Sequence, residues 1–148
     1  MSATNNIIDI AKYCIYQSNN LDTPLTNLEL QILLYHLQQK YAEKYNTPLF
    51  FDTIKIKSFP IIENVFYYFC GFGAMPIGFG KSDKQIYDKT KNLSEECRKL
   101  IDKILPQYTQ TSFFEKTKTY DYETSVYNRI KNKGVKEIEP FDFLTKNS

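Results

Sequence analysis

The glycine-rich stretch from Gly71 to Ser82 contains the residue types most often used to bind phosphate. Its second half, Gly78-Phe79-Gly80-Lys81-Ser82, ends like a P-loop, in which backbone amides and a lysine surround the phosphate oxygens. A P-loop also requires a glycine five residues before Gly80, and that position is Met75. A dinucleotide-binding loop fails too, because Pro76 occupies the place of its third glycine. We therefore expect a turn in which glycines adopt positive φ and the neighbouring phenylalanines pack against the domain.

Catalytic and metal-binding residue types are few. The single histidine, His36, is expected at the edge of an apolar helix face. A Cys–His nucleophile pair would need a cysteine to reach it across the fold, and nothing in the spacing requires this. The cysteines also lack the C-x-x-C pairing typical of zinc sites. We expect no catalytic residue, no metal, no cofactor and no enzymatic activity. We also expect reduced, buried thiols at all three cysteines, which are Cys14, Cys70 and Cys97.

The best-defined element is a long helix that opens at Thr26. Thr26 and Glu29 have the spacing of a capping box, in which each side chain pairs with an amide at the helix start. Apolar residues then recur at helical spacing from Leu30 to Tyr45, which predicts one amphipathic helix. Asn46 and Pro48 should end it, because proline disfavours helical geometry in the preceding residue.

An extended segment and a second, aromatic helix should follow. The alternation from Ile54 to Lys57 predicts a half-buried strand. Pro60 is expected to be the first residue of the next helix, where its missing amide costs nothing. Gly71 is a plausible C-terminal cap of that helix.

The remaining patterns also favour helices. We expect one at Ile7–Ile15 that ends near Asn19, one capped by Ser94 that ends at Pro106, short ones at Ser112–Glu115 and from Val126 to Gly134, and a terminal element begun by Pro140. The fold class that we predict is mainly α: a single compact helical domain spanning residues 1–148, with a minor strand or β-hairpin near residues 49–57.

The segment "PLTNLELQILLYHLQQKYAEKYNTPLF … SFPIIENVFYYFCGFGAMPI" resembles the phage-associated SocA-like antitoxin family, also called the Panacea domain. The family motifs "lT-xx-kLQKLLYya", "pLF", "yGPVvpevY" and "yG…pI" are similar to stretches that occur here in the same order. Phe59 stands where the family has a glycine before its proline. The matching residues are Leu25-Thr26, Leu30-Gln31, Leu33-Leu34-Tyr35, Pro48-Leu49-Phe50, Pro60-Ile61-Ile62, Val65-Phe66 and Gly73-Pro76-Ile77.

This resemblance implies an antitoxin or adaptor that binds another protein. In the family, the domain neutralises a cognate toxin directly or delivers it to a protease, with no chemical step. Consecutive helical positions point in different directions, so Tyr67 and Tyr68 should face outward if Val65 and Phe69 face inward. Packing of these tyrosines in the core stays an alternative. The expected partner-binding residues are Tyr35, on the exposed side of the long helix, with Phe59, Pro60, Tyr67, Tyr68 and Phe72.

Charge distribution bears on the alternative function, a nucleic-acid-binding regulator of a phage or mobile element. The net charge is only +2, and the densest basic stretch contains Lys131, Lys133 and Lys136. Nucleic-acid-binding proteins usually concentrate positive charge more strongly, so we expect a protein partner and regard nucleic acid as a weaker candidate. The sequence shows no apolar run of membrane-spanning length and no evident secretory signal, so we expect a cytoplasmic protein with no membrane partner.

Overall fold

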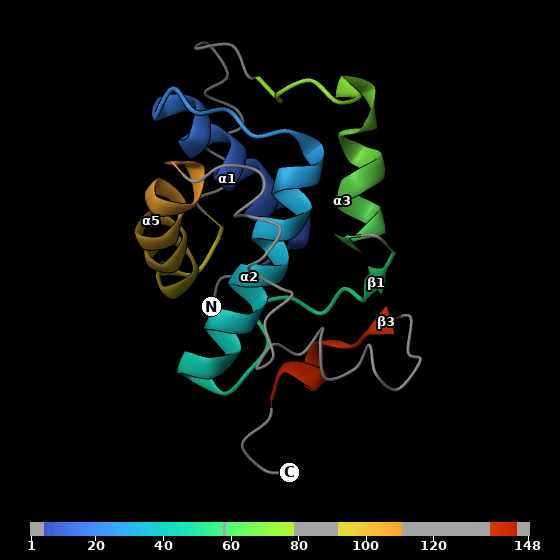
Figure 1. The fold of residues 1–148 in the computed structure, drawn as a ribbon. Helices are drawn as coiled ribbons and strands as arrows, with labels where there is room; N and C mark the ends of the chain where they lie inside the picture. Colours follow the sequence, from blue (N-terminus) through green and yellow to red (C-terminus); the bar gives the residue numbers. More distant parts are fainter. Residues whose placement is uncertain (1–4, 58, 79–91, 111–136, 145–148) are drawn as a thin grey trace.

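The long helix α2 (Asn27–Tyr45) forms the centre of the fold in this computed structural model, which describes residues 5–57, 59–78, 92–110 and 137–144. Helices α1 (Ile7–Asn20) and α5 (Glu95–Gln110) pack against each other and against α2, and the short helix α3 (Glu63–Tyr68) packs against both α1 and α2 (Figure 1). The mainly α-helical fold is therefore confirmed. The helices expected at Ser112–Glu115 and Val126–Gly134, the lysines Lys131, Lys133 and Lys136, and the Phe79–Ser82 part of the glycine-rich stretch lie outside the described residues.

Local signals at the two ends of α2 act as the sequence predicts. The hydroxyl of Thr26 accepts the amide of Glu29 at 3.2 Å, and the Glu29 carboxylate accepts the Thr26 amide at 3.0 Å. This capping box pairs two amides that a helix start otherwise leaves without partners. Asn46 ends the helix in the left-handed conformation, with φ of 55°.

The middle of α2 is buried around most of its circumference, which the amphipathic pattern did not predict. All residues from Leu30 to Tyr35 are buried, and so are Leu37 and Gln38. Within residues 30–38 only His36 is partly exposed, so the expected exposed position of Tyr35 is wrong. The ring of Phe143, 5.5 Å from the Tyr35 ring, covers it in an edge contact.

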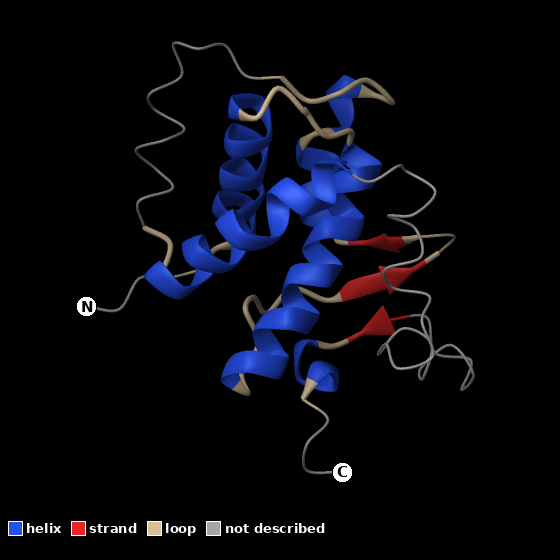
Figure 2. Cartoon of the chain, turned by 60° about the vertical axis from the view of Figure 1, so that its left-hand side comes forward, coloured by secondary structure: helices blue, strands red, loops and turns tan. Residues whose placement is uncertain are grey.

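A small antiparallel sheet lies along one side of the helices (Figure 2). Its strands β1 (Ile54–Ile56), β2 (Pro60–Ile61) and β3 (Glu137–Ile138) take the order β2-β1-β3. Pro60 pairs with Ile56 and does not begin a helix, since α3 starts only at Glu63. An edge strand accommodates proline, because one of its sides has no neighbour that needs the missing amide. The strand expected at Ile54–Lys57 is confirmed, although its partner β3 was not anticipated.

Helix α5 begins as expected and continues past the residue expected to end it. The Ser94 hydroxyl accepts the amide of Cys97 at 3.1 Å, but Pro106 lies inside the helix. Proline removes one helical hydrogen bond, yet the following turn is held by tertiary contacts. Leu105 and Tyr108 are buried, and the Tyr108 hydroxyl donates to the carbonyl oxygen of Glu29 at 2.7 Å.

The last described element, the 3-10 helix η2 (Pro140–Phe143), begins with proline as expected and packs against α2. Its buried Phe143 brings the C-terminal segment into the core. The short segment that leads to β1 is fixed by buried Gln38, whose side chain accepts the amide of Leu49 at 2.7 Å and donates to the Phe50 carbonyl at 2.8 Å.

Candidate functional site

Helix α3 and the 3-10 helix η1 (Cys70–Phe72) carry a group of exposed aromatic side chains. Val65 and Phe69 point into the core and are buried, while Tyr67 and Tyr68 are 62% and 54% exposed. The outward orientation of the two tyrosines is therefore as the helical alternation predicts.

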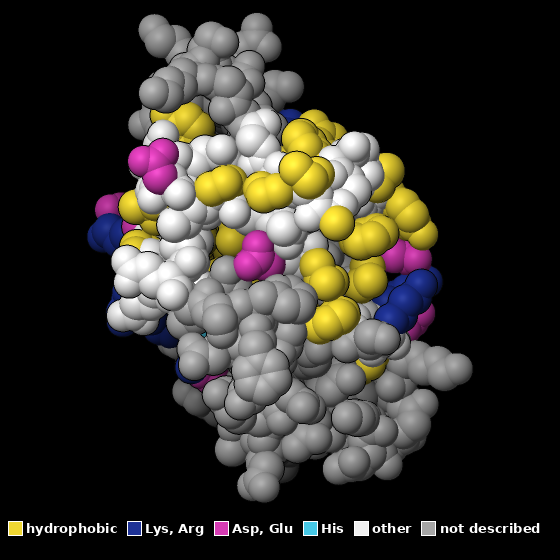
Figure 3. Space-filling view, turned by 45° about the horizontal axis from the view of Figure 1, so that its top comes forward, with side chains coloured by type: hydrophobic (Ala, Val, Ile, Leu, Met, Phe, Trp, Pro, Cys, Tyr) yellow, Lys and Arg dark blue, Asp and Glu magenta, His cyan; other side chains and the backbone are white. Residues whose placement is uncertain are grey.

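The chain after α3 adds further apolar atoms to this exposed area. Phe72 is partly exposed, and Met75, which the sequence reasoning did not select, is 68% exposed. Figure 3 shows hydrophobic side chains gathered on the face that is seen from the top of Figure 1. We call Tyr67, Tyr68, Phe72 and Met75 the aromatic surface.

Contacts with neighbouring side chains hold the two tyrosines in place. The Tyr67 ring meets Phe66 edge-on with centroids 5.8 Å apart, and Tyr68 meets Phe69 in the same way at 4.9 Å. The ammonium of Lys12, on α1, lies 5.1 Å from the centre of the Tyr68 ring. Such aromatic and cation–π contacts restrict side-chain motion, so a partner that binds here would lose less conformational entropy.

Two buried amide side chains of α2 position α3. Gln31 accepts the amide of Ile62 at 2.8 Å and donates to the Asn27 side-chain oxygen at 3.0 Å. Asn27 in turn donates to the carbonyl oxygen of Phe66 at 2.9 Å. From the sequence, Gln31 was identified only as part of the Leu30-Gln31 motif, with no structural role assigned to it. The signal that could have identified this pair is two amide residues four positions apart on an otherwise apolar helix face.

The turn after α3 depends on Gly73. This glycine has φ of 57° and ψ of −129°, a combination that side chains strongly disfavour. Gly71 was expected to cap α3, but it lies within η1 and has no positive φ, while Phe69 follows the last helical residue. The prediction of positive φ is thus correct for Gly73 and wrong for Gly71.

An apolar groove lies beside the aromatic surface. It has a volume of about 610 Å³ and lies between the first turn of α2 on one side and Ile61, Phe66 and the turn at Gly73 on the other. Hot-spot side chains at protein interfaces typically insert into such pockets. The lining residues are Thr26, Asn27, Leu28, Glu29, Ile61, Phe66, Gly73 and Ala74.

The six residues selected from the sequence do not form one site. Tyr67, Tyr68 and Phe72 share the aromatic surface. Tyr35 is fully buried under Phe143, and Pro60 is buried in β2. Phe59 is partly buried and packs against the core. Burial excludes Tyr35 and Pro60 from direct contact with a partner in this conformation.

Two of the three cysteines lie in the core, and their burial favours the protonated thiol. Cys14 and Cys97 are buried, and burial raises the pKa of Cys97 to about 12 and the pKa of Cys14 well above its usual value. A thiol with so high a pKa is a poor nucleophile. Cys70 is exposed, so the expectation that all three thiols are buried is wrong for it: it follows α3 on the solvent side.

Two further findings concern metal binding and membrane spanning in the part of the chain that the structure describes. No three His, Cys, Asp or Glu side chains there lie close enough together to hold a metal ion. None of the helices described combines the length and apolar composition needed to cross a membrane.

Comparison with known proteins gives no match to a family model, to a curated protein or to a solved structure.

Proposed function

We propose that this chain is a protein-binding antitoxin or adaptor that neutralises a cognate toxin, by direct binding or by delivery to a protease. The observation that carries the proposal is the exposure of Tyr67 and Tyr68, at 62% and 54%, beside an apolar groove. Tyrosines are enriched among the residues that contribute most to protein–protein affinity, and such residues cluster near pockets.

The mechanism that we propose is masking or presentation of the toxin. The aromatic surface would cover part of the toxin, and an apolar side chain of the toxin would enter the groove beside Phe66. The buried bonds from Gln31 and Asn27 support this, because they hold α3 rigidly against α2 before any partner arrives. We further propose a cytoplasmic location, where an exposed thiol such as that of Cys70 stays reduced.

The test is co-expression of the chain with the product of the adjacent gene. We expect the chain to restore growth of cells that make the toxin, and to co-purify with the toxin or lower its level. Repeating the experiment in a protease-deficient host separates the two mechanisms, since direct masking persists there and proteolytic delivery does not. Failure to rescue growth, to bind and to change toxin abundance would refute the proposal.

The same protein should be tested against DNA and RNA. A net charge of +2 predicts weak binding that falls steeply with salt. Tight, sequence-selective binding near physiological salt, lost on changing Lys131, Lys133 and Lys136 to alanine, would favour the nucleic-acid-binding regulator instead.

A further inference from the structure

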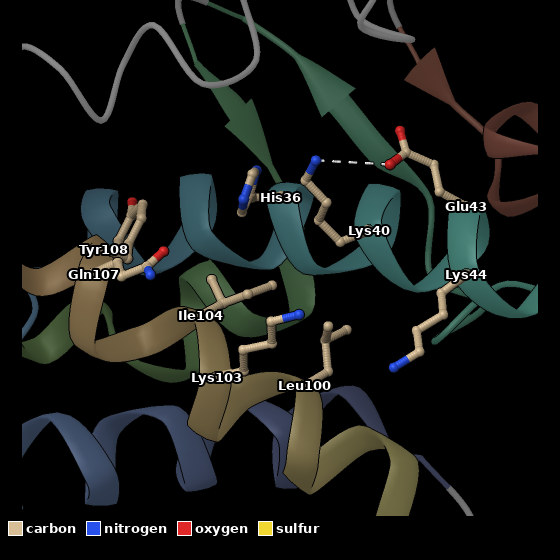
Figure 4. Close-up of a pocket in the computed structure, with 9 residues that line it drawn as sticks. All are labelled: His36, Lys40, Glu43, Lys44, Leu100, Lys103, Ile104, Gln107 and Tyr108. Carbon is tan, nitrogen blue, oxygen red and sulfur yellow. Dashed lines mark ion pairs between the residues drawn. The ribbon is translucent and has the colours of Figure 1, made fainter.

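A second groove lies between α2 and α5, and it shares no lining residue with the groove beside the aromatic surface. On α2, His36, Lys40 and Lys44 recur every fourth residue and so form one row along the helix. On α5, Leu100, Ile104 and Tyr108 form the facing row. Figure 4 shows these two rows on either side of the groove. Its volume of about 540 Å³ lies within the usual range for small-molecule sites.

The rim of this groove is positively charged. Lys40, Lys44 and Lys103 line it, and the one acidic side chain among the lining residues is Glu43. Glu43 pairs with Lys40 at 3.7 Å, as the dashed line in Figure 4 marks. Within the described residues, neither Lys44 nor Lys103 makes an ion pair, although the Lys44 ammonium lies 5.4 Å from the centre of its neighbour's ring, Tyr45. Two exposed positive charges therefore remain to attract an anion.

The floor of the groove is apolar. Leu100 and Tyr108 are largely buried, and Ile104 packs against the core while still lining the groove. His36 adds a polar but uncharged group: burial, together with the positive charge of Lys40, lowers its pKa to about 4, so the imidazole is neutral at pH 7. A neutral imidazole can donate one hydrogen bond and accept another.

We propose that the α2–α5 groove binds a small organic anion, namely an apolar chain or ring that carries a carboxylate or a phosphate group. The apolar body lies on Leu100, Ile104 and Tyr108, and the anionic group lies beside Lys44 and Lys103. Figure 4 shows these two lysines reaching toward the groove from α2 and α5 respectively. A neutral ligand would not use the charged rim, and a free inorganic anion would leave the apolar floor in contact with water. The ligand class therefore follows from the combination of the two features.

Because His36 is the single histidine of the chain, the Cε1–H proton of its imidazole gives the one NMR signal of its kind, and it reports on the groove. The experiment titrates the whole chain at pH 7 with octanoate and with monooctyl phosphate, and compares 1-octanol, octylamine and inorganic phosphate. We expect a saturable shift of the His36 signal with the two amphipathic anions. The neutral, cationic and inorganic compounds should bind at least about tenfold more weakly, a difference that corresponds to about 1.4 kcal/mol. No shift with either anion, or equal affinity for octylamine, would overturn the proposal.

A matched pair of double variants tests the role of the rim. Lys44→Gln with Lys103→Gln should weaken octanoate binding about tenfold or more. Lys12→Gln with Lys57→Gln removes the same charge from two lysines that lie outside the groove and, like Lys44 and Lys103, make no ion pair within the described residues, and should change the affinity by less than about twofold. Equal losses of affinity in both double variants would mean that the net charge of the protein alone attracts the anion. That result would contradict a specific binding site at Lys44 and Lys103.

A third variant separates this proposal from the protein-binding one. Tyr67→Ala with Tyr68→Ala alters the aromatic surface and leaves every lining residue of the α2–α5 groove intact. The shift of the His36 signal with octanoate should be unchanged in this variant. Its loss would place the anion on the aromatic surface and overturn the assignment to the groove. Failure of toxin neutralisation, in contrast, would leave the anion titration unaffected.

Discussion

Gln31 accepts the backbone amide of Ile62 at 2.8 Å within the protein interior, and so links α2 to the segment that leads into α3, 31 residues further along the chain. Ile62, whose amide donates this bond, lies immediately before α3, where no side-chain cap is present. A buried amide without a partner is costly, so the glutamine both satisfies this group and fixes where the aromatic helix begins.

The first prediction follows from that bond. Gln31→Leu keeps the volume but leaves the Ile62 amide and the Asn27 side-chain oxygen without their partner. We expect a loss of about 1–3 kcal/mol in the free energy of unfolding, measured in urea, and weaker partner binding because α3 is no longer fixed. Gln107→Ala, at an exposed position of α5, is the control and should change stability by less than about 0.5 kcal/mol. An unchanged urea midpoint for Gln31→Leu would show that water replaces the glutamine.

A second prediction concerns the aromatic surface. Tyr67→Ala with Tyr68→Ala should cost about 2 kcal/mol or more in partner binding while the protein still melts cooperatively, because both rings are more than half exposed. Tyr45→Ala, an exposed aromatic at the opposite end of α2, should leave binding intact. Calorimetric binding and a melting curve on the same preparations decide the question. Retained binding in a strongly destabilised double variant would assign the tyrosines to the core.

The third prediction compares two glycines of the turn. Gly73→Ala forces a side chain into a conformation with φ of 57° and should cost about 1–3 kcal/mol of stability. Gly71→Ala meets no atom within 4 Å and has no positive φ, so it should be neutral or stabilise by up to about 1 kcal/mol. Thermal denaturation of the two variants checks this. Equal effects would argue against the turn geometry described for Gly73.

A fourth prediction concerns pH. Burial, followed by the charge of Lys40, lowers the pKa of His36 from 6.5 to about 4, and Glu43 opposes this shift weakly. Between pH 4 and pH 6.5 the imidazole is protonated in the unfolded chain but neutral in the folded one. The free energy of unfolding is therefore highest above about pH 6.5 and decreases as the pH falls toward 4. From pH 7 to pH 5 we expect the wild type to lose about 2 kcal/mol more than His36→Gln, as measured by urea unfolding. Parallel losses would mean that the imidazole is not buried.

The fifth prediction uses thiol reactivity. Cys70 is exposed, whereas burial protects Cys14 and raises the pKa of Cys97 to about 12. A disulfide reagent at pH 8 should therefore modify one thiol rapidly in the native protein and all three in denaturant. Cys70→Ser should abolish the rapid phase. Because Cys70 adjoins the aromatic surface, a bulky label on it should also reduce partner binding. Rapid modification of two or more thiols in the native protein would contradict the buried positions.

The sequence correctly predicted the helix ends and the strand that depend on residues close together in the chain. The capping box at Thr26 and Glu29, the helix end at Asn46 and the alternation around Ile54 all depend on near neighbours in the chain. The outward direction of Tyr67 likewise follows from helical geometry alone.

The errors concern residues whose environment is set by distant parts of the chain. Tyr35 is buried because Phe143 covers it, and Pro60 lies in a strand because β1 offers it an edge. Pro106 stays helical because the contacts of Tyr108 hold the following turn. The α2–α5 groove exists only once two separate helices face each other, so no single segment could indicate it.

The contact between Tyr35 and Phe143 also has a consequence for biosynthesis. Tyr35 is synthesised long before Phe143, so α2 leaves the ribosome while the part of its apolar surface that Phe143 covers is still exposed. Pairing of such distant segments is slow compared with helix formation. The nascent chain is therefore exposed to chaperones and to aggregation until η2 arrives. A premature stop codon ahead of Phe143 would make this exposure permanent, and the shortened product should be degraded even though every residue of the aromatic surface is present.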